Sequence, residues 1–504
     1  ITITVTFKPT DTTNYNTVSK TYSFTPKART YTVTWDKNGA DSIGSTTSSC
    51  STTGNNLYCN ITSPTINRTN YTIKGWNQSK GSITASWNVG ITKSASEISW
   101  TNTNGLYTTT FYATAVINSI MNIKYGYASA TGTFDDPYLV GAAEDLVALS
   151  INVKLGQSYS GKYIQMYRSI DLKDTSDYMN PGNYSLFGDF NGDGVINAIY
   201  EEVNYSPGFR PIGYDSTSFS GTFDGKGYSI SNLYIDNITD AALFNNNSGT
   251  IKNLTVSGTI VGISRAAGLV SHNTGTISNV KNLVNAKVIM SANYEQTTDP
   301  SDFAHVGGIA AFNTGGTISN CSNSGTISVV DSSSKTTDSN AYIGGIVGTN
   351  DESAKIQNSY NSGTINGYST RDTVTGGIAG ANYSSSSILN SYNTAQITSY
   401  STDLRSYCGG ITGINRATIS NTYNIGKVSG SIGSTAIGNY IGGITYANES
   451  GSTSNSYYLN TCGATGVGTS KTSTQLKSLY STLGSAFKND SNNINSGFPI
   501  LSWQ

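Results

Sequence analysis

A short phrase built on two adjacent glycines returns five times between residues 306 and 455, and it constrains the fold more than any other feature of the sequence. Each copy reads Gly-Gly-Ile followed by Ala, Val or Thr, and the copies begin at Gly307, Gly344, Gly376, Gly409 and Gly442. Successive copies are 37, 32, 33 and 33 residues apart. A nearly fixed period of this length indicates a repeat architecture, in which each repeat packs on its neighbours.

Two further phrases complete the repeat. An Ile-x-Asn phrase ends at Asn320, Asn358, Asn390 and Asn421, and a Gly-Thr-Ile phrase begins at Gly325 and Gly363. Each repeat thus holds three runs rich in Ile, Val and Thr between Gly, Asn and Ser, which is typical of three short strands joined by turns. Apolar residues at helical spacing do not extend over three turns in any of these windows. Because one coil cannot bury its own apolar residues, the coils must stack. The sequence predicts an all-β chain dominated by a right-handed parallel β-helix.

The repeat resembles the GLUG-motif family, whose form is Gly-Gly-[Leu/Ile]-[Val/Ala]-Gly-x-Asn followed by Ile-x-Asn-[Ser/Cys]-Tyr. The resemblance covers about residues 122–504. It implies a large bacterial protein that is secreted or attached to the cell surface and is often adhesin-like, and it implies no catalytic residue in the motif.

The chain before the coils is expected to form smaller β modules. Residues 1–28 read as two alternating strands and resemble the last two strands of a bacterial Ig-like stalk module. Residues 29–115 resemble the Listeria-Bacteroides repeat (internalin B-repeat type), a β-grasp spacer, through the phrase Arg-Thr-x-Tyr-Thr-x-x-Gly-Trp from Arg68 to Trp76. Because Ile1 opens directly on strand-like alternation, without a signal peptide, we expect a mature or excised fragment of a longer precursor.

The remaining domain boundaries are predicted from where the repeats begin and end along the sequence. Residues 116–205 are predicted to cap the β-helix, with a helix at residues 142–150 that covers the end of the coils. The coils themselves are expected at residues 206–460, and residues 461–504 are expected to form a C-terminal cap with a short helix near residue 476.

The five cysteines suggest one disulfide. Cys50 and Cys59 lie in an insertion that departs from the β-grasp pattern, and their spacing would allow a small loop to close in an oxidising environment. Cys321, Cys408 and Cys462 are scattered through the coils and read as small buried residues.

Residues 189–197, Asp-Phe-Asn-Gly-Asp-Gly-Val-Ile-Asn, reproduce the first nine positions of a calcium-binding loop. Oxygen ligands at alternate positions wrap the cation, and a glycine at the sixth position permits the turn. The acidic residue due at position twelve is replaced by Tyr200, and a carboxylate just beyond could take its place. The predicted ligands of a structural calcium ion are Asp189, Asn191, Asp193, Val195, Asn197 and Glu201. The alternative is a surface turn made of Asn, Asp and Gly.

The Ile-x-Asn phrase predicts two ladders that run from coil to coil. The isoleucines would point inward and the asparagines would stack at a bend. Small residues that point inward would follow at Cys321, Ser359, Ser391 and Thr422, and tyrosines that point outward would follow at Tyr360, Tyr392, Tyr423 and Tyr457. An exposed row of tyrosines could bind sugars or protein. The alternative, which we favour at this point, is that the rows only stabilise the stack.

Composition narrows the functional class. The net charge is −1 and only 12% of residues are charged, so no excess of basic residues points to binding of nucleic acid or of an anionic membrane. No apolar stretch is long enough to insert in a membrane. The two histidines, His272 and His305, have no evident nucleophile partner, and the acids in the coils do not cluster.

We therefore expect a protein that is not an enzyme: an extracellular bacterial surface protein, either an adhesin or a stalk or fibre subunit. Its expected partners are a protein or glycan on a host or neighbouring cell, or further copies of itself in a fibre. A glycan-binding module that uses the tyrosine row is one alternative, and a polysaccharide-degrading β-helix enzyme is the other.

The calcium loop leads to a first test. If the ion is structural, small-angle X-ray scattering from the purified chain should change when a calcium chelator is added, and calcium should restore the original profile. A scattering profile that is indifferent to the chelator would reduce residues 189–197 to an ordinary turn.

Overall fold

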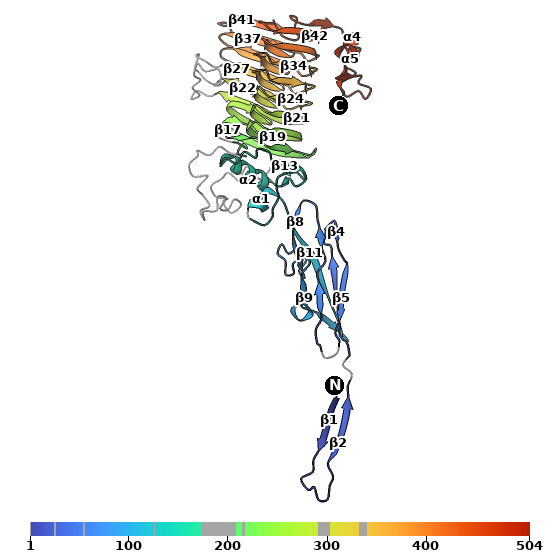
Figure 1. Ribbon diagram of the computed structural model, residues 1–504. Coiled ribbons are helices and arrows are strands. Elements are labelled where there is room, and N and C mark those ends of the chain that lie inside the picture. Colours follow the sequence, from blue (N-terminus) through green and yellow to red (C-terminus); the bar gives the residue numbers. More distant parts are fainter. Residues whose placement is uncertain are drawn as a thin grey trace. The chain divides into compact units, whose positions relative to one another are not determined.

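The computed structural model describes residues 2–24, 27–53, 56–124, 126–172, 208–213, 217–290, 303–331 and 340–504. The chain divides into two compact units (Figure 1). The first is formed by Ile1–Asn118 with Tyr125–Ser129, and the second by Ser119–Lys124 with Ala130–Gln504. No helix among the described residues is long and apolar enough to cross a membrane.

The first unit opens with a two-stranded hairpin of β1 (Thr2–Phe7) and β2 (Val18–Ser23). One face carries Thr and Ser hydroxyls that pair across the strands, as in Thr6 and Ser19 at 2.8 Å. The other face carries the apolar side chains of Ile3, Val5 and Phe7, which are 48%, 58% and 66% exposed. The Ig-like assignment and fibre formation through this hairpin both stay predictions.

The rest of the first unit is a mixed five-stranded sheet of β3 (Thr30–Asp36), β5 (Thr47–Ser51), β8 (Tyr71–Asn77), β10 (Thr101–Thr103) and β11 (Leu106–Ile117). β11 runs parallel to β3 and antiparallel to β8 and β10. Two ribbons flank the sheet, β4 (Ser42–Ile43) with β7 (Ile66–Asn67) and β6 (Asn60–Thr62) with β9 (Thr92–Ser94), beside the 3-10 helix η1 (Ala95–Glu97). Trp35, Trp76 and Trp87 form an aromatic core. The β-grasp assignment of this module stays a prediction.

The second unit begins with α1 (Ile120–Lys124), β12 (Tyr138–Val140) and α2 (Ala143–Lys154). Leu146, Leu149 and Val153 of α2 are buried in the same core as the side chains inside the coils. The buried Asp145 carboxylate accepts hydrogen bonds from the backbone N–H groups of Gly141 and Met121, at 3.0 and 3.3 Å, and so joins the start of α2 to α1. These helices lie beside the first coils, β13 (Tyr163–Met166) and β14 (Ile170–Asp171) (Figure 1).

The coils then rise in parallel and in register, so the predicted all-β fold with a parallel β-helix is confirmed. The first coils combine short strands with three long ones, β17, β19 and β21. In chain order they are β15 (Ser218–Phe219), β16 (Thr222–Asp224), β17 (Ser229–Ala241), β18 (Phe244–Asn247), β19 (Thr250–Ala267), β20 (Val270–Asn273) and β21 (Thr276–Met290). The next three coils each have five strands: β22 (Ala304–Gly307), β23 (Ala310–Thr314), β24 (Thr317–Ser319), β25 (Ser322–Asn323) and β26 (Ile327–Asp331); β27 (Ala341–Gly344), β28 (Val347–Asp351), β29 (Lys355–Gln357), β30 (Tyr360–Asn361) and β31 (Ile365–Ser369); β32 (Thr373–Gly376), β33 (Ala379–Asn382), β34 (Ser387–Leu389), β35 (Tyr392–Asn393) and β36 (Ile397–Ser401). The last coils are β37 (Arg405–Gly409), β38 (Thr412–Asn415), β39 (Thr418–Asn424) and β40 (Val428–Ile432), and then β41 (Gly438–Gly442), β42 (Ser452–Leu459) and β43 (Thr469–Lys471).

The expectation of three strands per coil is therefore wrong for the three complete coils that begin at β22, β27 and β32, because sharp corners divide the runs. At one corner Asn320, Asn358 and Asn390 adopt left-handed backbone conformations, with φ of 52°, 49° and 49°. Asparagine tolerates this region better than most residues, so it ends one strand and aims the next in a new direction.

The second glycine of each pair is required by close packing at another corner. A Cβ atom at Gly345 would lie 2.3 Å from the Gly377 carbonyl oxygen of the next coil and 2.4 Å from Cγ of Asn361. Such distances are far below van der Waals contact, so only glycine fits between the neighbouring coil and the asparagine. The second glycine of a pair and the buried asparagine of the same coil are thus packed directly against each other.

Two ladders of buried asparagines run through the inside of the stack, and the sequence analysis did not anticipate them. One comprises Asn247, Asn273, Asn313, Asn350, Asn382 and Asn415 and ends at the half-buried Asn448, and the other comprises Asn282, Asn323, Asn361, Asn393 and Asn424. In the second ladder each Nδ2 donates to Oδ1 of the next coil at 2.7–2.8 Å. Asn361 Nδ2 also donates to the Gly363 carbonyl (2.9 Å), and Asn361 Oδ1 also accepts from the Gly363 N–H (3.2 Å). Every donor and acceptor of this amide therefore has a partner.

Because its amide is fully hydrogen-bonded, Asn361 allows a test of how much the ladder stabilises the stack. Asn361→Ala should lower the free energy of unfolding by about 2–4 kcal/mol, because the buried amides of Asn323 and Asn393 on the neighbouring coils and the backbone of Gly363 each lose a hydrogen-bond partner. The measurement is urea denaturation followed by circular dichroism. Thr364→Ala, at an exposed position three residues away, is the matched control and should cost less than about 0.5 kcal/mol. Equal losses for the two variants would contradict this role of the ladder.

Candidate binding face

The predicted tyrosine row exists and is stacked from coil to coil. Tyr360, Tyr392, Tyr423 and Tyr457 occupy one register position on successive coils. The rings of Tyr360 and Tyr392 are 5.0 Å apart with an interplanar angle of 6°, and those of Tyr392 and Tyr423 are 4.8 Å apart at 5°. Outward side chains on stacked coils are held at the strand spacing, which suits parallel ring stacking.

The row is not exposed as expected: Tyr392 is 1% exposed and Tyr423 is fully buried. The covering element is the C-terminal segment, residues 472–504, which contains α4 (Ser473–Lys477), α5 (Tyr480–Leu483), β44 (Phe487–Lys488) and β45 (Ile500–Leu501). Its apolar side chains pack on the tyrosines, chiefly Leu476, Leu483, Phe487, Phe498 and Leu501. In Figure 1 the segment leaves the last coil and lies beside the stack. The expected open tyrosine surface is therefore wrong, because the chain itself buries it.

Hydrogen bonds show that the segment runs back toward earlier coils. Asn455 donates to the Thr482 carbonyl at 2.8 Å, and the Tyr423 hydroxyl donates to the Pro499 carbonyl. The Tyr392 hydroxyl donates to Oε1 of Gln504 at 2.9 Å. Near the segment's end, Nε1 of Trp503 donates to the carbonyl of Asn358 at 2.8 Å. The segment thus covers the row from β42 back to β30.

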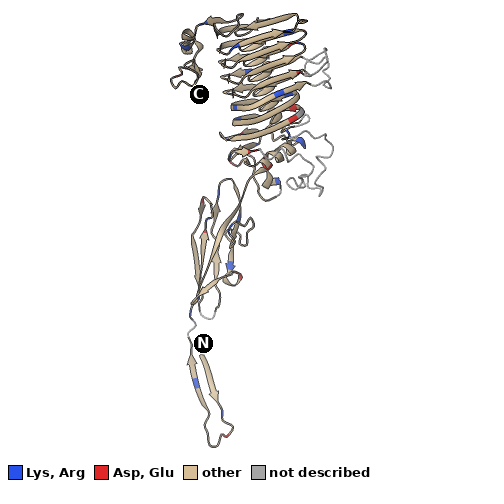
Figure 2. Ribbon diagram, turned by 180° about the vertical axis from the view of Figure 1, so that it is seen from behind, with Lys and Arg blue, Asp and Glu red and all other residues tan. Residues whose placement is uncertain are grey.

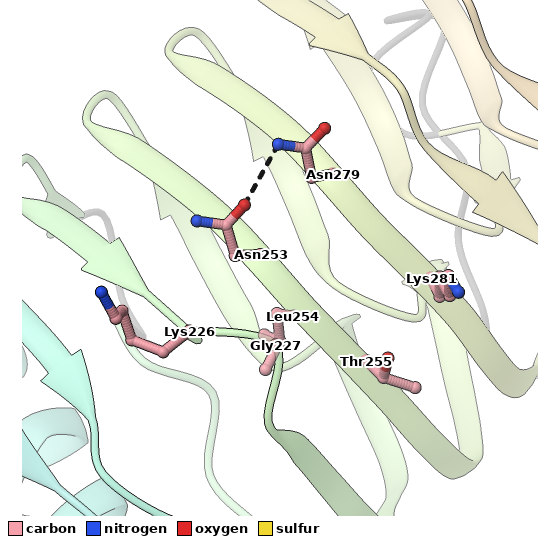
Figure 3. Close-up of a pocket in the computed structure, with 7 residues that line it drawn as sticks. All are labelled: Lys226, Gly227, Asn253, Leu254, Thr255, Asn279 and Lys281. Atoms are coloured by element: carbon pink, nitrogen blue, oxygen red, sulfur yellow. Dashed lines mark hydrogen bonds between the residues drawn. The ribbon is translucent and has the colours of Figure 1, made fainter. Parts of the chain in front are cut away.

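On the coils before Tyr360, the register position that the tyrosines occupy carries small and basic residues instead. Going back from Tyr360, it is occupied by Ser322, Lys281 and Thr255. A groove begins here beside the outer asparagine ladder. In this ladder Asn279 donates to Asn253 at 3.1 Å (Figure 3), and Asn320 donates to Asn279 at 3.1 Å. One part of the groove is lined by Lys226, Gly227, Asn253, Leu254, Thr255, Asn279 and Lys281. The adjoining part is lined by Asn279, Lys281, Asn320, Tyr360, Ile494, Trp503 and Gln504.

The outer asparagine ladder could be read from the sequence, and the groove could not. The corner positions of Asn320, Asn358, Asn390 and Asn421 are as expected, and Asn390 and Asn421 each donate to the preceding coil at 3.1 and 3.0 Å. The groove also needs Trp503 and Gln504, which reach it only because the C-terminal segment folds back. The signal that could have pointed to it is the change from tyrosine to Ser322 and Lys281 along one register position.

The other predicted site residues fall into separate places. The calcium ligands Asp189, Asn191, Asp193, Val195, Asn197 and Glu201 lie outside the described residues. Among the residues that are described, His, Cys, Asp and Glu form no group of three or more that could hold a metal. A disulfide joins Cys50 and Cys59. Cys321, Cys408 and Cys462 are buried free thiols, and burial raises the pKa of the Cys321 and Cys408 thiols to about 12.

Charged side chains do not form a large patch on the described coils. Figure 2 shows Lys, Arg, Asp and Glu scattered singly over the stack. Several are paired between neighbouring coils, as Arg405 is with Asp372 at 3.0 Å and Arg416 with Glu449 at 2.8 Å. Each histidine bonds a threonine: His272 Nε2 lies 3.0 Å from Oγ1 of Thr314, and His305 Nδ1 lies 3.0 Å from Oγ1 of Thr349.

Comparison with known proteins bears on the repeat. This chain carries the GLUG motif. The motif is matched at residues 304–328 and 339–366, where β22 to β31 build two successive coils. The resemblance seen in the sequence is thus supported for the β-helix, while the comparison gives no support for the β-grasp module.

Two curated proteins share limited sequence similarity with the chain. A provisionally named Gly-rich membrane protein of Evansella cellulosilytica is 29% identical over 163 residues, which covers 31% of this chain and 15% of that protein. Halomucin of Haloquadratum walsbyi is 28% identical over 172 residues, which covers 28% of this chain and 2% of that protein. The chain therefore matches only a small part of the length of each of these relatives.

Two solved structures also resemble the chain. A provisionally named immunoglobulin A1 protease from Bacteroides ovatus covers 75% of this chain and 95% of its own, with 18% identity and a TM-score of 0.42. An IgA1 protease covers 86% of this chain and 29% of its own, with 16% identity and a TM-score of 0.37. From the sequence we expected a protein that is not an enzyme. The names of these neighbours contradict that expectation, and we withdraw it.

The covered tyrosines give a test of the C-terminal segment. Burial raises the pKa of the Tyr392 and Tyr423 phenols well above the ordinary value of 10.0. Both phenols should therefore stay protonated in the folded chain through pH 10.0, and the stability they contribute should be lost as the pH rises further toward their folded pKa. Phe487→Ala removes a ring whose centroid is 6.0 Å from that of Tyr423, and it should free the segment at a cost of about 3–5 kcal/mol.

The measurement is a phenolate absorbance titration of the original chain and the variant. Phe487→Ala should move two phenols into the ordinary titration range. Leu283→Ala changes a side chain that is 47% exposed and lies outside the tyrosine cluster, so it should leave the titration unchanged. If Phe487→Ala titrates like the original chain, the segment does not control access to the row.

Proposed function

We propose that this chain is part of an extracellular bacterial surface protein, and that its β-helix serves as a rigid body for projection or attachment. The observation that supports this most directly is the in-register stack, in which asparagine ladders connect successive coils. Parallel backbone pairing and buried side-chain bonds between coils hold the described coils rigidly to one another. Such a body can hold a binding face at a fixed place.

The relatives support a surface location. One is named as a Gly-rich membrane protein and the other as a halomucin, and the GLUG motif lies within the coils. The disulfide between Cys50 and Cys59 adds an independent argument, because structural disulfides persist mainly outside the reducing cytosol. The proposed partners are a protein or glycan on a host or neighbouring cell.

Glycan binding is the second candidate function, and we now propose the groove as its site in place of the tyrosine row. The tyrosine row that first suggested it is buried under residues 472–504. The open polar groove next to that segment brings amide, basic and aromatic side chains together on the stack. Binding of sugars is therefore assigned to the groove and not to the buried tyrosines.

Surface location can be tested on intact cells of the bacterium that produces the protein. Antibodies against the folded chain should label unbroken cells, and brief treatment of those cells with an external protease should remove the signal. A cytosolic protein followed in the same samples is the control and should survive the treatment. Labelling that requires cell lysis would overturn the surface location.

Attachment needs a separate measurement. Beads coated with the folded chain should be retained on cultured epithelial cells or on neighbouring bacterial cells under flow. Beads coated with the heat-unfolded chain are the matched control, because they present the same composition without the stack. Equal retention of the two kinds of bead would contradict an adhesive role while leaving surface location untouched.

A further inference from the structure

We propose that the groove beside the outer asparagine ladder binds a chain of acidic sugars, such as a polyuronate. The inference deepens the proposed function, since it names the ligand through which the surface protein would attach. The groove follows the stack from Lys226 through Asn253 and Asn279 to Asn320, three coil spacings that together measure about 14 Å at about 4.8 Å each. A linear polymer with a regular repeat suits such a site better than a compact molecule does.

The groove carries positive charge without a counter-charge of its own. Lys226 and Lys281 both line it and both are exposed, and none of its described lining residues is acidic. Neither ammonium group forms an ion pair with a carboxylate among the described residues. Asp224, the nearest acid in sequence, is buried and accepts bonds from Lys226 N–H and Asn253 Nδ2, both at 2.9 Å. The lysines are therefore available to carboxylates of a ligand.

The backbone fixes where these groups stand. Lys226 has a left-handed backbone conformation, φ 53°, held by the bond from its own N–H to Asp224. Lys281 lies inside β21, where it pairs with Thr255 and Ser322 on the neighbouring coils. Figure 3 shows both lysines flanking the asparagine ladder, with Thr255 and Leu254 between them. Neither position depends on a ligand to form it.

The asparagine ladder adds groups that match sugar hydroxyls. Asn279 and Asn320 each use one amide hydrogen to reach the preceding coil, which leaves a second N–H on each amide for a ligand. The amide oxygen of Asn279 accepts one bond and has capacity for another. Because the ladder repeats at the coil spacing, it presents alternating donors and acceptors along the groove.

Aromatic rings close one end. The centroids of Tyr360 and Trp503 are 5.9 Å apart, and both residues line the groove. The Trp503 N–H is already bonded to Asn358, which holds the indole in place and leaves its face as an apolar platform. The C–H face of a sugar ring can pack on such a platform, whereas a simple anion would not use it. Among the residues that the structure describes, two lysines line the groove, far fewer than the phosphate contacts a nucleic acid would need.

The test is calorimetric titration of the purified full chain with oligogalacturonate, and with the same oligomer as its methyl ester. The acidic form should bind more tightly, and added NaCl should weaken its binding. Lys226→Ala and Lys281→Ala should each weaken binding of the acidic form by roughly three- to fivefold, with little effect on the ester. Lys355→Ala is the matched control, because Lys355 is exposed on the same stack but does not line the groove.

Trp503→Ala should weaken the binding of both forms alike, because a stacking contact does not depend on the carboxylate. The phenolate titration of Tyr392 and Tyr423 verifies that the C-terminal segment stays in place in this variant. Absence of binding by the original chain would overturn the proposal. So would an equal loss in Lys355→Ala, or equally tight binding of poly-glutamate, which has the charge without the sugar.

These outcomes are separable from those of the cell experiments. Calorimetry uses the purified chain and does not depend on where the protein resides. Antibody labelling of intact cells does not depend on any ligand. Binding without surface labelling would refute the proposed location alone, and surface labelling without binding would refute the sugar groove alone.

Discussion

Everything in the second unit depends on pairing between coils in register. Each short strand in the middle of the stack finds hydrogen-bond partners on the coils before and after it, so a residue at a corner must fit its counterparts on both sides. Buried asparagines meet this demand because one amide can bond the local backbone and two neighbouring amides at once, as Asn361 does. The glycine pair belongs to the same constraint, since a Cβ at Gly345 would collide with the Asn361 side chain. The same packing of glycine against asparagine is thus used in successive coils.

The period of the repeat was enough to predict the β-helix, because the periodic residues are the ones that face other coils. The outer asparagine ladder was predictable for the same reason. The asparagines of the two buried ladders recur at the same period. In the sequence, however, an asparagine beside a strand suggests a turn unless its hydrogen-bond partner is known. The partner of Asn361 is on another coil, so the sequence alone does not reveal it. The bond from Trp503 to Asn358 joins residues 145 positions apart, which no local pattern encodes. For that reason the sequence placed the tyrosines correctly in a row and wrongly on the surface.

The C-terminal segment changes what the tyrosine row can do. Stacked tyrosines on an open side of the coils would form a continuous apolar stripe, a surface that invites association. Leu476, Phe487 and Leu501 convert that stripe into a small second core. Trp503 and Gln504 of the segment lie beside Tyr360, next to the coils on which Ser322 and Lys281 take the tyrosine position. These two residues therefore line one end of the groove. One register position therefore serves two purposes along its length, internal packing under the segment and an open polar face beyond it.

The two parts of the groove differ in how firmly they are held. Lys281, Asn279 and Asn320 belong to strands and corners of the stack, so little backbone ordering is left to occur when a ligand binds. Trp503 belongs to the C-terminal segment, whose hold depends on the contacts with the tyrosines. A ligand that touches both parts favours the docked segment, and the docked segment strengthens ligand binding by the same free energy. The geometry of the groove thus couples recognition of a ligand to burial of the tyrosine row.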